Sequence, residues 1–207
     1  MSSHRVVQTP AGEAWADVEV PDGSARGLLM IGHGAGGTVA APDIVVVRQA
    51  ALAAGLAVAA VTQPYRVAGR KAPAPAPALD LAWLAVLAHL RDDPSLAQLP
   101  LIAAGRSSGA RVACRTAAAA GARGVIALAF PLHPPGRPEK SRQDELDAAG
   151  VPVLVVQGDG DPFGLPQPSM TRGKRREVLV LPGDHALRKE HAQIAAAARR
   201  FLLARTR

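Results

Sequence analysis

Cysteine is nearly absent from this 207-residue sequence, which contains only Cys114. A single cysteine excludes an internal disulfide framework and a zinc site built on cysteine thiolates, and it favours a reducing compartment. We therefore expect a cytoplasmic protein in which Cys114 is a small core residue. Aromatic residues are also scarce, at 3% of the chain, although hydrophobic residues make up 48%. The core must be built mainly from Ala, Val and Leu.

Long apolar runs are missing as well. No run reaches the roughly 20 residues that a membrane-spanning helix requires. Residues 1–15 lack the apolar stretch of a secretory signal. The chain is long enough for one substantial core, so we expect residues 1–207 to form a single domain with no membrane partner.

Acidic residues are fewer than basic ones, 17 against 24, and the formal net charge is +7. This balance raises the hypothesis of a nucleic-acid partner. However, the basic clusters at residues 174–176 and 199–200 are short and lack interleaved aromatic side chains on which bases can stack. We expect no nucleic-acid partner. The sequence contains no closely paired carboxylates and no His/Cys cluster that would predict a metal site. We expect neither a metal nor a cofactor.

Short apolar segments alternate with helical ones along the chain. The expected strands lie at residues 26–31, 56–61, 99–104, 124–130, 151–157 and 177–181, after an edge strand or hairpin within 6–20. The expected helices lie at residues 42–54, 79–90, 110–120 and about 187–203. Residues 66–78 contain three prolines and are expected to form an extended surface loop, while 133–150 should be irregular with at most a short helix near 143–148.

This alternation predicts an α/β fold: a mostly parallel sheet of about six to seven strands, with helices on both faces and no large cap domain. In such a sheet the reactive site lies beyond the carboxyl ends of the strands. Polar residues at those ends are therefore the candidates for function.

Gly105–Gly109 reads Gly-Arg-Ser-Ser-Gly and stands between an expected strand and an expected helix. The Gly-x-Ser-x-Gly spacing predicts a nucleophile elbow, because glycines two before and two after the serine remove Cβ atoms that would collide in the tight turn. Ser107 would then be exposed, with a helix N-terminus behind it that favours developing negative charge. On its own the pattern also fits an ordinary strand-to-helix turn.

Two later strand ends supply an acid and a base. Asp161 lies in the loop after the strand at 151–157, and His185 lies after the final strand. A hydroxyl nucleophile needs a base, and the base needs a carboxylate to orient it. We prefer Asp161 to Asp159, because the following Pro-Phe-Gly turn can aim its carboxylate; Asp159 is expected to bond nearby backbone amides. Asp184 is expected to be a turn or cap residue.

Gly32–Gly37, which follows the strand at 26–31, has two interpretations. It satisfies Gly-x-Gly-x-x-Gly, but the end of the next strand lacks the acidic residue that a dinucleotide site uses to bind ribose. Alternatively, the amide of Ala35 would pair with that of Ser108 to form an oxyanion hole. His33, Gly34 and Gly36 are then candidates for contacting a substrate.

Arg106 precedes the central serine of the elbow. Its guanidinium is suited either to a carboxylate of a substrate or to a structural ion pair. The sequence favours the structural role without excluding the other.

Taken together, the motifs resemble the α/β-hydrolase superfamily, in particular its small dienelactone-hydrolase-like members and the group that includes a testis-expressed protein and a subunit of a histone acetyltransferase complex. The resemblance is carried, in order along most of the chain, by residues 33–37, 105–109, 130–136, 158–164 and 183–185. It implies that Ser107 is the nucleophile, His185 its base and Asp161 the orienting acid. The resemblance also implies that the loop from His133 to Pro138 borders the site, which makes His133 a possible substrate-binding residue. Dienelactone hydrolase itself uses a cysteine nucleophile, so its substrate is not carried over.

The expected activity is hydrolysis of a small ester, thioester or related acyl substrate by a serine hydrolase without a metal or cofactor. One alternative is a non-catalytic binding or scaffold protein on the same fold, because a fold does not guarantee turnover. A second is a nucleotide-binding oxidoreductase that uses Gly32–Gly37. The sequence predicts no particular oligomeric state.

Overall fold

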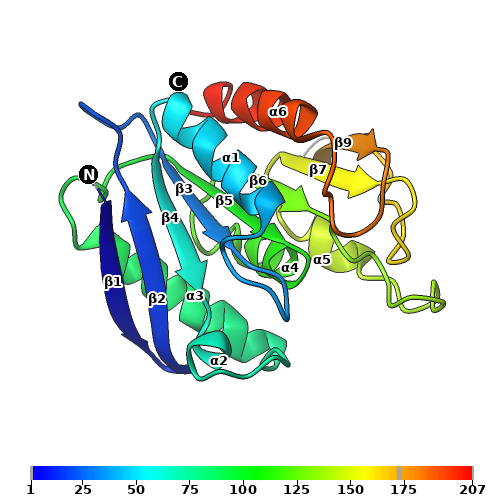
Figure 1. Cartoon of the computed structure of the whole chain (residues 1–207), viewed down its shortest axis with the longest axis horizontal. Helices are drawn as coiled ribbons and strands as arrows, with labels where there is room; N and C mark the ends of the chain where they lie inside the picture. Colours follow the sequence, from blue (N-terminus) through cyan, green and yellow to red (C-terminus); the bar gives the residue numbers. More distant parts are fainter. Residues whose placement is uncertain (1, 172–173, 207) are drawn as a thin grey trace.

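The computed structural model describes residues 2–171 and 174–206, and Figure 1 shows the course of the chain. Its strands are β1 (Ser2–Thr9), β2 (Gly12–Glu19), β3 (Leu28–Gly32), β4 (Ala57–Thr62), β5 (Leu101–Arg106), β6 (Gly124–Leu128), β7 (Val153–Gly158), β8 (Ser169–Thr171) and β9 (Lys174–Leu181). Its helices are α1 (Pro42–Ala53), α2 (Pro64–Val67), α3 (Ala76–Arg91), α4 (Ser108–Thr116), α5 (Gln143–Asp147) and α6 (His191–Leu203).

The strands form one sheet in the order β1-β2-β4-β3-β5-β6-β7-β9-β8. Pairing is parallel from β4 through β9 and antiparallel at both edges, where β1 and β2 form a hairpin and β8 pairs with β9. The predicted fold class is confirmed. The sheet is wider than the expected six to seven strands. Residues 2–19 form both strands of a hairpin rather than one edge strand, and the three-residue β8 is too short to produce a recognisable pattern.

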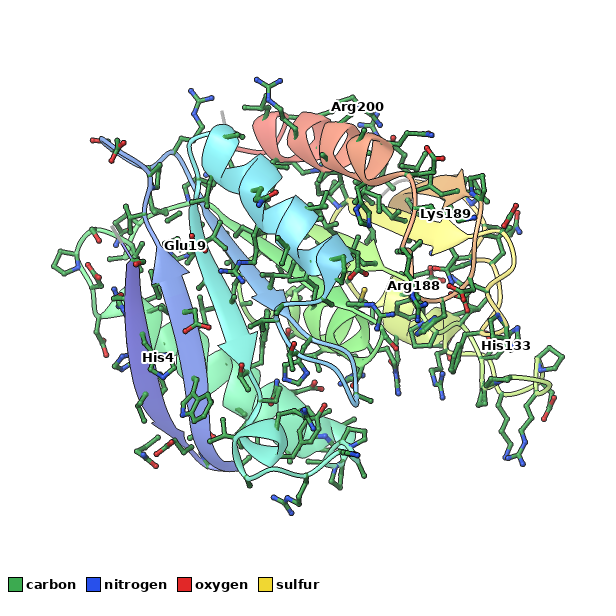
Figure 2. The ribbon with its side chains drawn as sticks, viewed as in Figure 1. His4, Glu19, His133, Arg188, Lys189 and Arg200 are labelled. Atoms are coloured by element: carbon green, nitrogen blue, oxygen red, sulfur yellow. The ribbon has the colours of Figure 1, made fainter. Side chains whose placement is uncertain are left out.

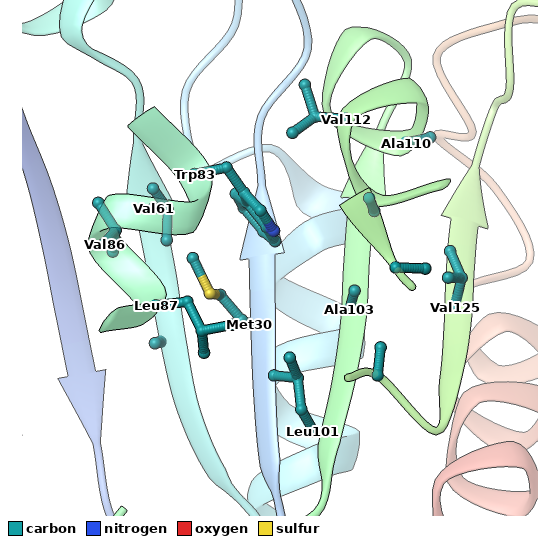
Figure 3. Close-up of a cluster of buried hydrophobic side chains, with 14 of the residues drawn as sticks. Met30, Val61, Trp83, Val86, Leu87, Leu101, Ala103, Ala110, Val112 and Val125 are labelled. Atoms are coloured by element: carbon teal, nitrogen blue, oxygen red, sulfur yellow. The ribbon is translucent and has the colours of Figure 1, made fainter. Parts of the chain in front are cut away.

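Helices cover both faces of the sheet and bury its alternating side chains. Leu28 and Met30 of β3 pack with Trp83 of α3 on one face, as Figure 3 shows for Met30 and Trp83. Leu29 and Ile31, of opposite parity, pack on the other face in the core that includes α1 and α6. This alternation is the period of a strand that is buried on both sides.

Cys114 of α4 is fully buried in the core on the α3 and α4 face, as predicted. Burial raises the pKa of its thiol to about 12. The thiol is therefore held in its protonated, unreactive form.

Two expected boundaries around the Pro-rich segment were wrong. Residues 66–67 belong to α2 rather than to a loop, and α3 begins at Ala76 rather than near residue 79. Both helices carry a proline in their first turn, Pro64 in α2 and Pro77 in α3. Proline is tolerated there because its missing N–H has no partner within the helix in any case.

The segment between β6 and β7 contains only α5, so no cap domain covers the carboxyl edge of the sheet. At that edge the chain leaves β3, β5, β7 and β9 through the four polar loops singled out by the sequence. Within residues 2–171 and 174–206, no helix combines the length and apolar character needed to span a bilayer.

Candidate active site

The turn between β5 and α4 holds Ser107 in a strained conformation, with φ 52° and ψ −110°. This region is rarely occupied by residues with a side chain, and such strain is typical of a nucleophile elbow. The flanking glycines make the turn possible. A Cβ on Gly105 would lie 2.2 Å from the carbonyl carbon of Gly109, and one on Gly109 would lie 2.7 Å from the carbonyl oxygens of Gly32 and His33. The half-buried Ser107 is thereby lifted to the end of the sheet.

A chain of hydrogen bonds joins Ser107, His185 and Asp161, which come from three different loops. Ser107 Oγ lies 2.9 Å from His185 Nε2, and His185 Nδ1 lies 2.8 Å from Asp161 Oδ2. A carboxylate only accepts, so the imidazole proton belongs on Nδ1, and Nε2 is left to accept the Ser107 hydroxyl proton. This is the arrangement that a serine nucleophile and its base require.

The Asp161 carboxylate is completely buried and is held at both oxygens. Oδ1 accepts from the Phe163 amide at 2.9 Å, while Oδ2 accepts from Gln157 Nε2 at 2.8 Å as well as from His185. Gln157 lies at the end of β7 and is itself fully buried. These bonds fix the direction in which the carboxylate faces the imidazole.

The two neighbouring aspartates have the roles that the sequence predicts. Asp159 Oδ1 accepts from the Gly183 amide at 2.9 Å and so ties the β7 loop to the β9 loop. Asp184 Oδ1 accepts from the Ala186 amide at 2.9 Å within its own turn. Neither of these bonds involves the His185 ring.

Comparison with known proteins places the chain in a family. A family described as an alpha/beta hydrolase domain matches residues 25–200. The chain belongs to the α/β-hydrolase family. Among curated proteins, none matches it significantly.

Solved structures share the hydrolase fold at low sequence identity. An α/β serine hydrolase without a lid from Xanthomonas campestris is 19% identical, with a TM-score of 0.74 over 96% of this chain and 92% of that one. Est1E from Butyrivibrio proteoclasticus is 18% identical, with a TM-score of 0.79 over 99% of both chains. A dienelactone hydrolase from Anabaena variabilis is 18% identical, with a TM-score of 0.75 over 100% of this chain and 99% of that one.

In this α/β-hydrolase domain, the side chain of His33, which is only 2% exposed, anchors the glycine loop after β3. The Gln63 amide donates to His33 Nε2 at 3.0 Å, so the ring proton is on Nδ1, which donates to the Gly34 carbonyl at 2.8 Å. Burial lowers the pKa of His33. His33 is therefore a neutral anchor whose ring nitrogens are both engaged.

The anchored carbonyls determine where the loop amides point. Because the C=O and N–H of one peptide unit face opposite ways, the His33 bond to the Gly34 carbonyl turns the Ala35 amide away from His33. Tyr65 Oη likewise donates to the Ala35 carbonyl at 2.7 Å. Gly34 adjoins the nucleophile, since a Cβ on it would lie 3.4 Å from Ser107 Cβ. A Cβ on Gly36 would meet open space.

Arg106 has the contacts of a structural residue. Its Nε lies 3.0 Å from Asp43 Oδ2, and its Nη2 donates to the His185 carbonyl at 2.9 Å. The Asp43 side chain is fully buried; burial raises its pKa, and the Arg106 charge opposes that rise. The guanidinium is thus engaged by the protein itself, in line with the role that the sequence favoured.

His133 stands next to the site rather than in the hydrogen-bonded chain; Figure 2 shows it on the loop after β6. Its amide donates to the Phe163 carbonyl at 3.0 Å, and its ring packs against Gly164. The Phe163 ring in turn packs on His185, with centroids 4.4 Å apart. His133 therefore supports the turn on which the imidazole rests.

Sequence reasoning missed three residues that support the site: Asp43, Tyr65 and Gln157. Only Gln157 left a usable signal, as the single polar side chain in an apolar segment that was recognised as a strand.

Proposed function

We propose that this protein is a serine hydrolase in which Ser107, His185 and Asp161 act as a catalytic triad on a small ester, thioester or related acyl substrate. The observation that carries the proposal is the pair of hydrogen bonds that places His185 between the Ser107 hydroxyl and a fixed carboxylate. The hydrolase family and the strained elbow support it. The cytoplasm is the compartment that we propose.

The reaction runs in two steps. Ser107 Oγ attacks the acyl carbonyl while its proton passes to His185 Nε2, and Asp161 stabilises the imidazolium. The tetrahedral intermediate collapses, the bond to the leaving group breaks, and His185 returns the proton to the leaving alcohol or thiol. Water, deprotonated by His185, then attacks the acyl-enzyme and releases a carboxylic acid and free Ser107.

The developing oxyanion would be held by two backbone amides. The Ser108 amide is one of the first N–H groups of α4, which have no partner within the helix. The Ala35 amide is turned away from His33 by the anchored Gly34 peptide, in a loop that adjoins Ser107. Removing one oxyanion donor typically costs about 3 kcal/mol of transition-state stabilisation. These two amides are thus the proposed oxyanion hole.

The substrate should be small and held in an open site. No cap domain encloses Ser107, and the short segment with α5 is the only cover between β6 and β7. Est1E has been solved with ferulic acid bound, so aromatic esters belong in the test panel. We further propose that the chain is one of the small dienelactone-hydrolase-like members, within the group of the testis-expressed protein and the acetyltransferase-complex subunit.

An active-site probe tests the mechanism directly. A fluorophosphonate should label the wild-type protein on Ser107, adding one adduct by intact-protein mass spectrometry. Ser107→Ala should not be labelled, whereas the neighbouring control Ser108→Ala, which keeps its backbone amide, should be. Equal labelling of Ser107→Ala and wild type would overturn the role of Ser107.

Turnover distinguishes an enzyme from a scaffold. The wild-type protein should hydrolyse at least one member of a panel of short-chain to medium-chain acyl esters, aromatic esters and thioesters, and Ser107→Ala should not. Labelling of Ser107 without turnover of any panel member would refute the proposed substrate class but would still support Ser107 as the nucleophile. Neither labelling nor turnover would instead favour a non-catalytic binding protein.

A further inference from the structure

A hollow lies at the opposite end of the sheet from Ser107, where β7 and β9 begin and α6 ends. It has a volume of about 740 Å³, within the range of small-molecule sites. Figure 1 shows α6 running beside β7 and β9 at this side of the molecule. None of its lining residues takes part in the proposed hydrolysis.

The fold brings Arg175, Arg176 and Arg200 of the two basic clusters together with Arg205 in this hollow. Arg175 and Arg176 enter from β9, and Arg200 and Arg205 enter from the end of α6 and the residues after it. Figure 2 shows Arg200 on the outer side of α6. Neither cluster alone suggests a site, because the residues of each are neighbours in the chain. Only the fold, which places residues of β9 and residues at the end of α6 around one hollow, gathers the four guanidiniums.

Two of the four arginines are neutralised by the protein and two are not. Arg176 pairs with Asp147 at 2.8 Å, and Arg200 pairs with Glu177. Within the part of the chain that the structure describes, Arg175 and Arg205 have no acidic partner in an ion pair. The hollow therefore carries an excess of two positive charges.

Arg205 is positioned as a binding residue would be. Its guanidinium lies over the Phe201 ring, 3.8 Å from the centroid, and Nη1 donates to the Phe201 carbonyl at 3.3 Å. Its Nε is buried and has no hydrogen-bond partner among the described residues. Burial lowers the pKa of Arg205, the nearby charge of Arg175 lowers it further, and the charge of Glu177 opposes this fall. An anion between Arg175 and Arg205 would relieve the repulsion between the two guanidiniums.

We propose that this hollow binds a small phosphate monoester, with the phosphate between Arg175 and Arg205 and the organic part against Pro152, Pro168 and Val178. A phosphate monoester carries about two negative charges near neutral pH, which matches the two unpaired guanidiniums. The planar fork of arginine suits phosphate oxygens. The apolar side chains in the lining give the organic part a surface to contact.

A small molecule fits this site better than a nucleic acid. The hollow is a local cavity, and Phe201, the only aromatic residue in its lining, is 4% exposed and covered by Arg205. Single-stranded nucleic acids bind along grooves with exposed aromatic platforms. A pocket for a single phosphate provides neither an extended groove nor an exposed aromatic side chain.

Calorimetric titration of the full-length protein with phenyl phosphate at fixed ionic strength and pH 8 tests the proposal. We expect saturable 1:1 binding, at least tenfold weaker binding of the monoanion phenyl sulfate, and no binding of phenol. Arg175→Gln should weaken phenyl phosphate binding at least tenfold. Arg175 is exposed, so this variant should fold and retain the wild-type hydrolytic rate.

A matched control and a second variant make the result decisive. Arg70→Gln, which changes an exposed arginine outside the hollow, should bind like wild type. Arg205→Lys keeps a charge and an aliphatic stem over Phe201 but loses the fork, and it should also bind more weakly. Protein already labelled by fluorophosphonate should bind phenyl phosphate unchanged.

Four results would overturn the proposal. The first is no saturable binding. The second is equal weakening by Arg70→Gln, with sulfate and phosphate esters bound alike, which would indicate an adventitious ion only. The third is loss of binding after labelling, which would place phenyl phosphate at Ser107. The fourth is tighter, Arg175-dependent binding of a single-stranded oligonucleotide, which would assign the surface to nucleic acid.

Discussion

Arg106 donates a hydrogen bond from Nη2 to the main-chain carbonyl of His185 at 2.9 Å, and so ties two loops of the site together. Arg106 directly precedes Ser107, and its own Nε is held 3.0 Å from the buried Asp43 carboxylate. The distance between the proposed nucleophile and its base therefore depends on an ion pair that touches neither reacting group. Asp43 and Arg106 are positioning residues.

Asp43→Asn removes the charge that compensates the Arg106 guanidinium. Breaking a buried pair by removing one partner is strongly destabilising, and we expect the free energy of unfolding to fall by about 3 kcal/mol. The kcat should fall while KM changes little, because Arg106 holds the His185 loop rather than the substrate. Urea denaturation and steady-state kinetics measure both effects, with Asp22→Asn on the exposed surface as control. Equal stability of Asp43→Asn and wild type would show that the pair is not important.

The sequence was sufficient for the residues that lie at strand ends but not for those that support them. Ser107, Asp161 and His185 are recognisable because each follows an apolar strand in a loop with its own local signature, and parallel strands bring such loops to one edge. Asp43 lies in the first turn of α1, where an acidic residue is usual because of the helix dipole, so its sequence position does not reveal its second role. Its partner Arg106 lies in β5, and no local pattern connects the two.

The secondary structure shows the same division between elements with a local sequence signal and elements without one. The central strands are apolar on both faces and were found within one or two residues of their bounds, because burial on both sides imposes composition. By contrast, β8 owes its three residues to pairing with β9, and α2 covers only four residues. Neither length is enough for a periodic pattern. Such elements are set by tertiary contacts rather than by local propensity.

Gln157 should act on the reaction through Asp161. Gln157→Leu removes the donor at 2.8 Å from Asp161 Oδ2, and the same Nε2 also serves the Phe130 and Gly164 carbonyls. Leaving buried acceptors unpaired typically costs about 1–3 kcal/mol, and we expect a comparable loss in the free energy of unfolding together with about a tenfold lower kcat.

Gln157→Glu separates positioning from mere packing. Two carboxylates that share a site raise the pKa of one of them. The acidic limb of the pH–kcat profile should therefore move to higher pH in Gln157→Glu, while Gln193→Glu on the exposed surface leaves it in place. An unmoved limb with normal folding would argue that Gln157 does not contact the working carboxylate.

His33 should make stability depend on pH. Its pKa is lowered by burial, so below the ordinary value of about 6.5 the unfolded chain binds a proton that the folded protein resists. The contribution of His33 to the free energy of unfolding is therefore complete above pH 6.5 and is lost as the pH falls below that value. For one proton, the free energy of unfolding changes by at most about 1.4 kcal/mol per pH unit.

His33→Asn tests this dependence, because the amide does not titrate. The difference in the free energy of unfolding between wild type and His33→Asn should shrink as the pH falls from 7.5 to 5, measured by urea denaturation at each pH. The exposed control Gln98→Asn, which changes no titrating group, should show a constant difference. A constant difference for His33→Asn as well would mean that His33 is not held neutral in the folded protein.

Two glycines of the loop after β3 provide a matched pair for the last prediction. A Cβ on Gly34 would lie 3.0 Å from Arg106 Nη1 and 3.4 Å from Ser107 Cβ, whereas a Cβ on Gly36 would meet nothing within 4 Å. Gly34→Ala should therefore displace the guanidinium or the loop amide, at about 1–3 kcal/mol of stability, as overpacking usually does. Its kcat should fall more than its stability alone explains, because the Ala35 amide moves with the loop.

Gly36→Ala should keep wild-type stability and kcat, measured by urea denaturation and ester hydrolysis on the same preparations. If both alanines were tolerated equally, the glycine loop would not be packed against the nucleophile, and the proposed oxyanion hole would lose its second donor.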